Sequence, residues 1–385
     1  MKLKTGGRTI PFALGFDDVS IVPSGTTMDP EDVSTDFRLG NHVFSIPFIA
    51  SAMDGVVDVR FAVEMGKLGG LAVLNLHGLQ TRYEDPGEQI ERIIAAGAAD
   101  ATPLIQSVYK SEIKEDLVIK RIREMKKGKI VCAVSSVPQD AERFGEVAED
   151  AGADVFVVQS TVTSVRHVSS RRKALDLKKL CRRLKIPVVA GNCVGRRVVR
   201  DLMDAGAAGV LVGVGPGAAC TTRGVLGIGA PQVTATLEAA AARDEFHKAT
   251  RRYVPVITDG GMSTGGEVVK AFASGADAVM LGAIFAKSRE APGKGFHWGM
   301  ATSHEALPRG TRIHVGVRGA LKNILAGPAE VDDGTQNLVG CLKSAMGVCG
   351  AKNIRAFHRV ELVASTSFMT EGKAYQFAQK TGMGR

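Results

Sequence analysis

A regular alternation of short apolar runs with alanine-rich, helix-like segments constrains the fold of this chain more than any other feature. Eight runs rich in β-branched residues recur along the sequence, at residues 46–50, 71–74, 130–134, 155–158, 187–190, 209–212, 254–258 and 278–281. Such runs separated by helical segments are typical of parallel strands joined by crossover helices. Eight of these units predict an α/β fold, the (β/α)8 TIM barrel.

Residues suited to chemistry follow most of the apolar runs. Polar side chains or glycines stand directly after six of them, at residues 51–54, 159–161, 191–192, 213–215, 259–261 and 282–283. Barrel enzymes form their sites at the carboxyl ends of the strands. We therefore expect these six endings to converge on one mouth of the barrel.

Two segments interrupt the alternation. Residues 77–129 are longer than one crossover needs and are predicted to hold an extra short strand at 103–108 and two helices. Residues 292–317 are rich in Gly, Pro and His and contain the only tryptophan, Trp298; a long loop in this place predicts an active-site lid. We expect a single catalytic domain over residues 1–385, with a barrel core at about 45–290, the lid at about 292–317 and a C-terminal extension at about 318–385.

Bulk composition is that of an ordinary globular protein, with 45% apolar and 23% charged residues. No apolar run approaches the roughly 20 residues that span a bilayer, and residues 1–11 lack the apolar core of a signal peptide. A cytoplasmic location is therefore expected. Much of the net charge of +9 falls between residues 166 and 185. A solvated basic helix explains it; nucleic-acid binding is the alternative, which no aromatic RNA-binding motif supports.

One cysteine differs from the others in its surroundings. The six cysteines form no C-x-x-C pair, so free thiols are expected. Cys220 lies in the run G-V-G-P-G-A-A-C-T-T-R at residues 213–223, directly behind an apolar run. Glycines let the backbone approach a ligand, and Thr222 places a hydroxyl beside the sulfur. This setting favours a nucleophile, although a structural loop with a small buried thiol would give a similar local pattern.

Glycines after the seventh and eighth runs indicate a phosphate site. Barrels commonly bind phosphate at these two strand ends through backbone amides. Gly260, Gly261 and Gly282 occupy them here, so a phosphorylated ligand is expected; tight turns alone are the alternative.

In sequence order, these motifs resemble those of the IMP dehydrogenase and GMP reductase family. The family's opening L-x-F-D-D-V-x-x-V-P is similar to residues 14–23, its P-x-x-S-A-M-D to 47–54, and its A-G-N to 190–192. The D-G-G motif matches residues 259–261, and G-P-G-x-x-C-T-T-R matches 215–223. Several independent motifs in the same order make chance similarity negligible.

The resemblance implies a purine mononucleotide, IMP or XMP, at the barrel mouth and NAD as hydride acceptor, with Cys220 attacking carbon 2 of the base. Asp259 would bind the ribose hydroxyls and Asn192 would bond near the base. The implied substrate contacts are Ser51, Met53, Asn192, Gly217, Ala218, Asp259, Gly261, Gly282, Ala283, Gly299 and Met300. The implied cofactor contacts are Gln159, Ser160, Thr161, Asn192, Gly213 and Gly215, and carbonyls of Gly215, Gly217 and Cys220 would form a potassium site. A homotetramer is implied as well.

Several positions depart from the family pattern. Ala218 and Ala283 replace serines that touch phosphate, Gln159 replaces the aspartate that holds the nicotinamide ribose, and the lid tyrosine is replaced around His297 and Trp298. The paired CBS modules that most dehydrogenases insert after the second strand are absent, since residues 77–129 are too short for them. The chain is thus most similar to the CBS-free, IMP dehydrogenase-related branch.

Three functions fit the sequence. An IMP dehydrogenase, which makes XMP for guanine nucleotide synthesis, is preferred because residues 338–351 resemble the dehydrogenase form and residues 224–232 lack the paired lysines of GMP reductases. A GMP reductase using NADPH is the first alternative, since Glu305 lies within one residue of the reductases' lid glutamate. A catalytically weak purine-nucleotide-binding regulator is the second.

The lid lacks the tyrosine that family dehydrogenases pair with arginine to activate water. No Tyr occurs in residues 292–317. Arg309 and Arg312 are the candidate cations, because residues 307–310 resemble the end of the dehydrogenase lid. Glu305 is the candidate ordinary base, and Thr222 could pass the proton.

Overall fold

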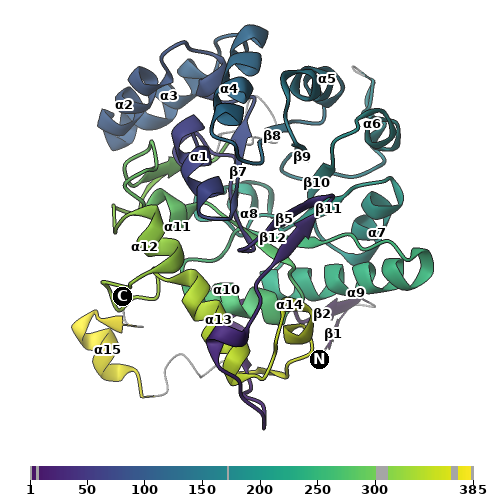
Figure 1. Cartoon of the computed structure of the whole chain (residues 1–385), viewed down its shortest axis with the longest axis vertical. Coiled ribbons are helices and arrows are strands. Elements are labelled where there is room, and N and C mark those ends of the chain that lie inside the picture. Colours follow the sequence, from purple (N-terminus) through teal and green to yellow (C-terminus); the bar gives the residue numbers. More distant parts are fainter. Residues whose placement is uncertain (1, 6–7, 171–172, 301–310, 366–371, 383–385) are drawn as a thin grey trace.

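The computed structural model of the protein describes residues 2–5, 8–170, 173–300, 311–365 and 372–382 (Figure 1). Its centre is a closed barrel of eight parallel strands, ordered β10-β11-β12-β13-β6-β7-β8-β9. The strands are β6 (Phe48–Ala50), β7 (Leu71–Asn75), β8 (Ala133–Ser136), β9 (Val155–Gln159), β10 (Val188–Cys193), β11 (Gly209–Val212), β12 (Val256–Asp259) and β13 (Ala278–Leu281). The predicted TIM barrel is confirmed, and each of the eight apolar runs contributes one strand.

Helices surround the barrel, as Figure 1 shows. The crossovers and the segment after the last strand carry α1 (Val59–Lys67), α4 (Glu115–Lys127), α5 (Ala141–Ala151), α6 (Leu177–Arg183), α7 (Arg196–Asp204), α9 (Gln232–Thr250), α10 (Gly265–Ala273) and α11 (Ala283–Ala286). Several begin at side-chain caps: Asp58 accepts the Phe61 N–H at the start of α1, and Thr264 and Glu267 form a reciprocal capping box at α10. Within the described residues, no helix is long and apolar enough to cross a membrane.

The barrel interior and the layer between barrel and helices are two separate cores. Along β9, Val155 and Val157 belong to the inner core, whereas Phe156 and Val158 pack against the helices. This period of two is what a strand covered on both faces requires. The hairpin of β4 (Phe37–Leu39) and β5 (His42–Phe44) adds Phe37, Leu39 and Phe44 to the inner core. The hairpin thus packs on the amino-terminal end of the barrel and leaves the opposite end for a site.

The segment between β7 and β8 contradicts one prediction. The expected strand at 103–108 is wrong, because these residues belong to α3 (Ala98–Val108), which follows α2 (Pro86–Ala95) and precedes α4. The segment therefore holds three α-helices, not two. The physical reason is the spacing of Ala101, Ile105 and Val108, which recurs with the period of a helix and buries one face.

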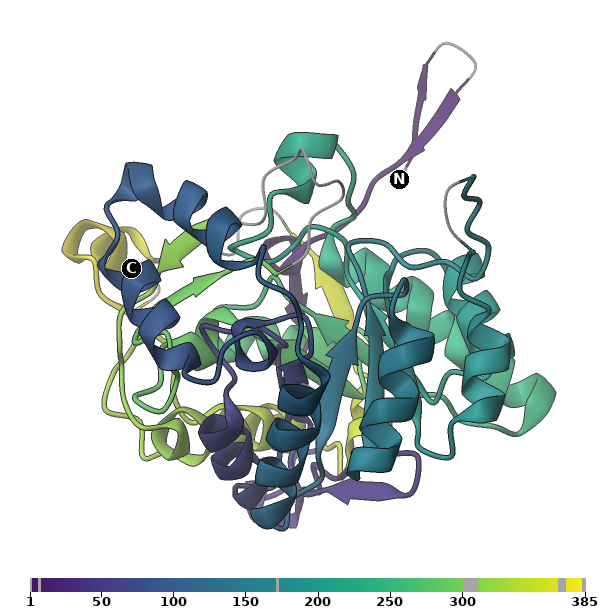
Figure 2. The same cartoon turned by 90° about the horizontal axis from the view of Figure 1, so that it is seen from above.

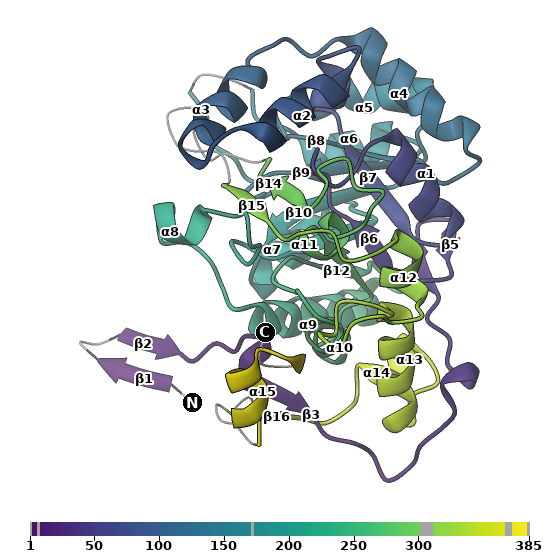
Figure 3. The same ribbon diagram turned by 90° about the vertical axis from the view of Figure 1, so that its left-hand side faces the viewer.

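The predicted lid begins and ends on a small antiparallel ribbon. Strands β14 (Phe296–Trp298) and β15 (Arg312–His314) pair with Trp298 opposite Arg312. They lie beside α2 and α3 in Figure 3, and Arg312 donates to the Ile94 carbonyl at the end of α2 (3.3 Å). Arg309 and Glu305 lie outside the described residues. The ribbon joins the lid to the helices that precede β8.

The two ends of the chain meet on one side of the barrel. β3 (Val19–Ile21) pairs antiparallel with β16 (Leu362–Ala364). Between the lid and β16 run α12 (Leu321–Ala326), α13 (Leu338–Val348) and α14 (Ile354–Phe357), and α15 (Ala374–Gln379) lies near the C-terminus. The hairpin of β1 (Lys2–Thr5) and β2 (Arg8–Pro11) projects from the body, as Figure 2 shows.

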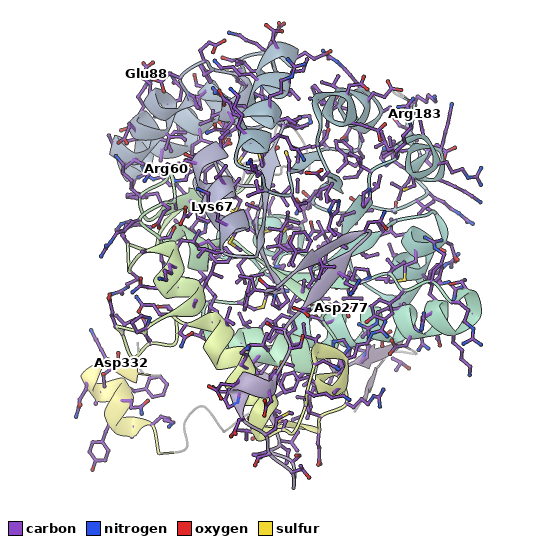
Figure 4. The ribbon with its side chains drawn as sticks, in the orientation of Figure 1. Arg60, Lys67, Glu88, Arg183, Asp277 and Asp332 are labelled. Carbon is purple, nitrogen blue, oxygen red and sulfur yellow. The ribbon has the colours of Figure 1, made fainter. Side chains whose placement is uncertain are left out.

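Charged residues lie mostly on the outer faces of the helices. In Figure 4, Glu88 and Arg183 sit at the periphery, whereas Asp277 lies inside the molecule. Asp277 accepts from Arg243 Nη1 (2.8 Å) and from the Val256 N–H (2.8 Å). Burial opposes the charge on Arg243, but the Asp277 carboxylate raises the arginine's pKa above its ordinary value. This pair ties α9 to the beginning of β13, away from the strand ends at the mouth.

Candidate active site

The mouth of the barrel follows from the period of two along each strand. Each strand has a last apolar residue in the inner core, for example Ile49 in β6 and Ile257 in β12. The residue two positions later falls on the same face, at the carboxyl end. These positions are Ser51, Asn75, Ser135, Gln159, Gly191, Gly213, Asp259 and Gly282. The inner core therefore ends in a ring of polar residues and glycines.

Three of the predicted residues form one hydrogen-bonded group at this ring: Gln159 and Asp259 belong to the ring, and Asn192 follows its member Gly191. Asn192 Nδ2 donates to Asp259 Oδ2 (2.8 Å), and Gln159 Nε2 donates to Asn192 Oδ1 (2.9 Å) and to Asp259 Oδ2 (3.2 Å). Both ends of the Asn192 amide are thus fixed. Gln159, predicted to bind the cofactor, is joined to two predicted substrate contacts.

The Asp259 carboxyl has an unusual protonation equilibrium. Burial raises its pKa to about 6, although the hydrogen bond from Asn192 works in the opposite direction. An aspartate at this position is a carboxylate at pH 7 and gains a proton within the range of mildly acidic buffers. As a carboxylate, it is an acceptor for two vicinal hydroxyls.

Gln232 links two strand ends beneath the site and is not among the residues predicted from the sequence. Its side chain is 3% exposed, and Nε2 donates to the carbonyls of Val212 (2.9 Å) and Asp259 (2.8 Å). These bonds join the end of β11, which leads into the cysteine loop, to the end of β12. The available signal was a glutamine at the first position of a long helix, directly after Pro231.

The cysteine loop lies against the turn after β12. A Cβ at Gly261 would come within 2.9 Å of Pro216 Cβ, and one at Gly260 within 3.4 Å of Gly217. Both glycines have positive φ, +78° and +80° in chain order. This close packing of two backbones explains why the turn needs glycine, and it places the loop of Cys220 beside Asp259.

Cys220 differs physically from the other cysteines. It is the exposed one of the six, and its thiol donates to the Thr222 hydroxyl at 3.1 Å. Thr222 is 7% exposed and opens the short helix α8 (Thr222–Leu226). Burial raises the pKa of the Cys132 and Cys193 thiols to about 12 and that of Cys181 to about 11. Those thiols are poor nucleophiles at neutral pH.

Two glycines give the cysteine loop its path. Gly213 has φ +143°, and a Cβ there would lie 2.4 Å from the Asp259 carbonyl oxygen. Gly215 has φ +77°, and its Cβ would meet Arg223 Cγ at 2.5 Å. Side chains at either position would force the loop away from β12. Ala218 is exposed between Gly217 and Cys220.

The end of β6 forms the opposite wall. The Ser51 N–H donates to the Leu281 carbonyl (2.9 Å), and a Cβ at Gly282 would lie 2.8 Å from Met53 Sδ. Ala283 follows as the first residue of α11. The structure thus brings together four predicted substrate contacts, Ser51, Met53, Gly282 and Ala283.

The lid meets the cysteine loop at one described bond. The Thr311 N–H donates to the carbonyl of Ala219 (3.1 Å), the residue before Cys220. Gly299 and Met300 continue from β14 and are partly buried. Arg312 has a different setting: its guanidinium lies over the Phe296 ring (5.0 Å to the centroid) and donates to the Ile93 and Ile94 carbonyls. In this structure Arg312 supports the lid ribbon.

The residues predicted for cofactor and potassium have these positions. Ser160 and Thr161 follow β9, and the Ser160 hydroxyl donates to the Val162 carbonyl (2.9 Å). The Gly217 carbonyl accepts the Cys220 N–H (3.0 Å); a carbonyl has two lone pairs, so this bond is compatible with a cation ligand. The described residues hold no cluster of His, Cys, Asp or Glu that could bind a metal ion.

His297 is a buried histidine without hydrogen bonds in the described structure. It is 2% exposed, and neither ring nitrogen has a partner there. Burial lowers its pKa to about 4, so the ring is neutral at pH 7. Strand β14, which carries His297, packs against α11 next to Gly282. Such an unsatisfied buried group calls for a ligand or a water molecule.

A sequence profile of the IMP dehydrogenase / GMP reductase domain matches residues 13–375. The chain belongs to this family. Among its relatives, an uncharacterized oxidoreductase of Mycobacterium tuberculosis is 40% identical over 365 residues, covering 92% of this chain and 97% of the relative. The inosine-5'-monophosphate dehydrogenase of Borreliella burgdorferi is 31% identical over 382 residues, covering 89% and 91%.

A solved structure supports the same assignment. The IMP dehydrogenase/GMP reductase-like protein of Corynebacterium glutamicum superposes with a TM-score of 0.90 at 34% identity, covering 94% of this chain and 98% of that one. Membership of the IMP dehydrogenase/GMP reductase family makes the chain an oxidoreductase, in agreement with the motifs at the barrel mouth.

Proposed function

We propose that this member of the family is an IMP dehydrogenase, which oxidises IMP to XMP with NAD through a covalent bond to Cys220. The observation that carries the proposal is the pairing of an exposed Cys220 thiol with the buried Thr222 hydroxyl at 3.1 Å, in a loop packed against the Asp259 turn. A soft nucleophile beside a ribose-binding carboxylate fits attack on the base of a purine nucleotide.

The chemistry would proceed in two stages. The Cys220 thiol loses its proton and the sulfur forms a bond to carbon 2 of the hypoxanthine; that carbon would then give up its hydrogen as hydride, which leaves a thioimidate. Water then adds its oxygen to carbon 2, the carbon–sulfur bond breaks, and one water proton returns to the sulfur, so that XMP and the Cys220 thiol are released. When bound, NAD supplies the hydride acceptor.

The nucleotide would lie across the ring of strand ends. Asp259 as carboxylate accepts from the ribose hydroxyls, and Asn192, held by Gln159, faces the base. Backbone amides around Gly261 and Gly282 would hold the phosphate together with Ser51, since Ala218 and Ala283 offer no hydroxyl. The neutral His297 ring, with both nitrogens unpartnered in the described residues, is suited to donate one further hydrogen bond there.

The nicotinamide would contact the loop after β9. Ser160 and Thr161 supply hydroxyls, whereas the Gln159 amide already donates to Asn192 and Asp259. Carbonyls of Gly215, Gly217 and Cys220 remain the proposed potassium ligands, and such a cation would fix the loop geometry.

For water activation we favour Arg309 over Arg312. Arg312 is committed to the Ile94 carbonyl and the Phe296 ring. Arg309 lies two residues before Thr311 in the sequence. The Thr311 N–H donates to the carbonyl of Ala219, the residue before Cys220. Thr222 would relay the proton, and Glu305 stays the candidate in the GMP reductase alternative.

The decisive assay offers both reactions to the same protein. Incubation with IMP and NAD should produce XMP and reduced cofactor in equal amounts, whereas incubation with GMP and NADPH should leave the cofactor unchanged. The Cys220→Ala protein is the matched control. If NADPH is oxidised with GMP and NAD is not reduced with IMP, the protein is a GMP reductase. If nucleotide binds and neither reaction occurs, the protein is a regulatory protein. The homotetramer that the family resemblance implies, and the cytoplasmic location expected from the sequence, remain part of the proposal.

A further inference from the structure

Three segments that are distant in the sequence meet at the hydroxyl of Tyr109. The residue caps the C-terminus of α3 and is 5% exposed. Its hydroxyl donates to Asp54 Oδ2 (2.5 Å) and accepts from Trp298 Nε1 (2.8 Å). Met300 Sδ lies 3.3 Å from the same oxygen. One side chain thus joins the helical segment 77–129, the loop after β6 and the base of the lid.

The Asp54 end of this chain of bonds belongs to the wall of the site. Asp54 is 1% exposed and follows Ser51 and Met53 in the loop after β6. Its Oδ2 also accepts the Leu79 N–H (2.8 Å), and a Cβ at Gly78 would lie 2.2 Å from Oδ1. The carboxylate is therefore held from two directions, and it fixes Tyr109 relative to the end of β6.

The Trp298 end belongs to the lid. Trp298 is fully buried in a small apolar cluster with Leu79, Ile90 and Ile105. Its strand also rests on the β6 loop, because a Cβ at Gly55 would lie 2.7 Å from the Phe296 carbonyl oxygen. Gly299 and Met300, both predicted to touch the nucleotide, follow Trp298 directly. The position of the Trp298 indole therefore sets the position of Gly299 and Met300.

We propose that Tyr109 is a positioning residue for the nucleotide site: its hydroxyl sets the lid base, through Trp298, against the loop that carries Ser51 and Met53. The inference rests on the proposed function, since it takes residues 299 and 300 as nucleotide contacts. Buried hydrogen bonds to a carboxylate fix geometry more strictly than apolar packing alone. The helical segment before β8 thereby acts as the support of the lid.

The chain supplies both a reporter and a matched control. Trp298 is the only tryptophan, so its fluorescence reports on the lid base without any assay of activity. Tyr83 lies on the same helical segment, and its hydroxyl contacts the Val108 carbonyl (2.8 Å) and the Ser111 hydroxyl (2.7 Å). Tyr83→Phe therefore removes a comparable hydroxyl that touches neither Asp54 nor Trp298.

The first experiment compares Tyr109→Phe, Tyr83→Phe and the wild-type protein without ligand. In Tyr109→Phe alone, we expect a shifted Trp298 emission, stronger quenching by acrylamide, and faster deuterium exchange in residues 296–300 and 311–316. Equal spectra and exchange in Tyr109→Phe and wild type would overturn the proposal. This arm is independent of whether the protein oxidises IMP.

The second experiment measures IMP affinity and thermal unfolding of the same proteins. The dissociation constant for IMP should rise about 10-fold in Tyr109→Phe and stay unchanged in Tyr83→Phe, because small misplacements of binding groups have large effects. A purely structural role would lower the unfolding midpoint of both variants and leave IMP affinity equal. If wild type does not bind IMP, the proposed function fails while the fluorescence arm still decides on Tyr109.

If the Tyr109→Phe variant does not fold, a measurement on the wild-type protein tests the proposal instead. The indole N–H of Trp298, labelled with ¹⁵N, should give one resonance that exchanges slowly with solvent, because its proton is held by Tyr109 inside a buried cluster. Exchange at the rate of a free indole would overturn the proposal.

Discussion

The Cys220 sulfur and the Thr222 hydroxyl lie 3.1 Å apart, with the cysteine exposed and the threonine 7% exposed. The bond joins a reactive group at the surface of the loop to a fixed group in the first turn of α8. This geometry distinguishes Cys220 from the five cysteines that are buried or partly buried, and it leads to the first prediction.

Replacing Cys220 should separate catalysis from binding. Cys220→Ala is expected to lower kcat by more than about 10³-fold, as loss of a nucleophile does, while IMP binding changes little. IMP should slow alkylation of Cys220 in the wild type, measured by mass spectrometry of labelled peptides. Cys181→Ala is the control and should turn over normally. Full activity of Cys220→Ala would rule out the covalent route.

The raised pKa of Asp259, about 6, predicts a defined pH dependence. Because the folded state holds the proton more tightly than the unfolded state, this carboxyl costs stability as pH rises from about 4 through 6. Asp259→Asn should therefore raise the unfolding midpoint more at pH 8 than at pH 4.5. A larger gain at pH 4.5 would contradict the assigned sign.

The same carboxyl should govern nucleotide affinity in acid. Protonation removes the acceptor for the ribose hydroxyls, so IMP should bind up to about 10-fold more weakly for each pH unit below 6. The IMP phosphate titrates in the same range. Asp259→Asn is therefore the reference. Calorimetry of IMP binding to this variant gives the pH dependence that comes from the phosphate, and the additional pH dependence of the wild type is assigned to Asp259.

Restoring two hydroxyls tests the phosphate position. Ala218→Ser combined with Ala283→Ser should tighten IMP binding, with about 0.5–1.5 kcal/mol from each new hydrogen bond. Ala230→Ser, beyond α8, is the control and should have no effect. Unchanged affinity in the double variant, measured by calorimetry, would place the phosphate elsewhere.

The lid arginines should differ in their kinetic effect. Arg309→Ala is expected to keep a single-turnover burst of reduced cofactor and to stop steady-state turnover, because hydride transfer precedes hydrolysis. Arg312→Ala should loosen the lid ribbon and weaken binding instead, since Arg312 holds the Ile94 carbonyl. Rapid-mixing absorbance measurements distinguish the two. Normal turnover of both variants together with loss in Glu305→Gln would indicate a reductase-like lid.

The barrel could be predicted because its strands are continuous apolar runs, most of them followed directly by polar residues or glycines. The runs at 71–74 and 155–158 became β7 (Leu71–Asn75) and β9 (Val155–Gln159), each one residue longer. Backbone pairing continues past the apolar part, so the polar residue at the mouth is still held in the sheet. That rigidity explains why Gln159 can hold Asn192 so closely.

The errors and omissions have a different origin. The strand expected at 103–108 is wrong because Ala101, Ile105 and Val108 bury one face of a helix that continues through Pro103. Gln232 and Tyr109 were missed because their bonds reach residues distant in sequence: Tyr109 contacts Trp298 across 189 positions. The residues that surround Gln232 and Tyr109 in the sequence give no indication of these hydrogen-bond partners.

The position of β6 in the barrel has a consequence for how the protein is made. β6 pairs with β7 on one side and with β13 on the other. One edge of β6, the first barrel strand, is therefore covered only when β13, the last strand, has been made. During synthesis, an unpaired parallel edge is therefore exposed until residues near 281 have left the ribosome, and β3 waits longer still, for β16. An unpaired strand edge of this kind makes a partly synthesised chain prone to aggregation.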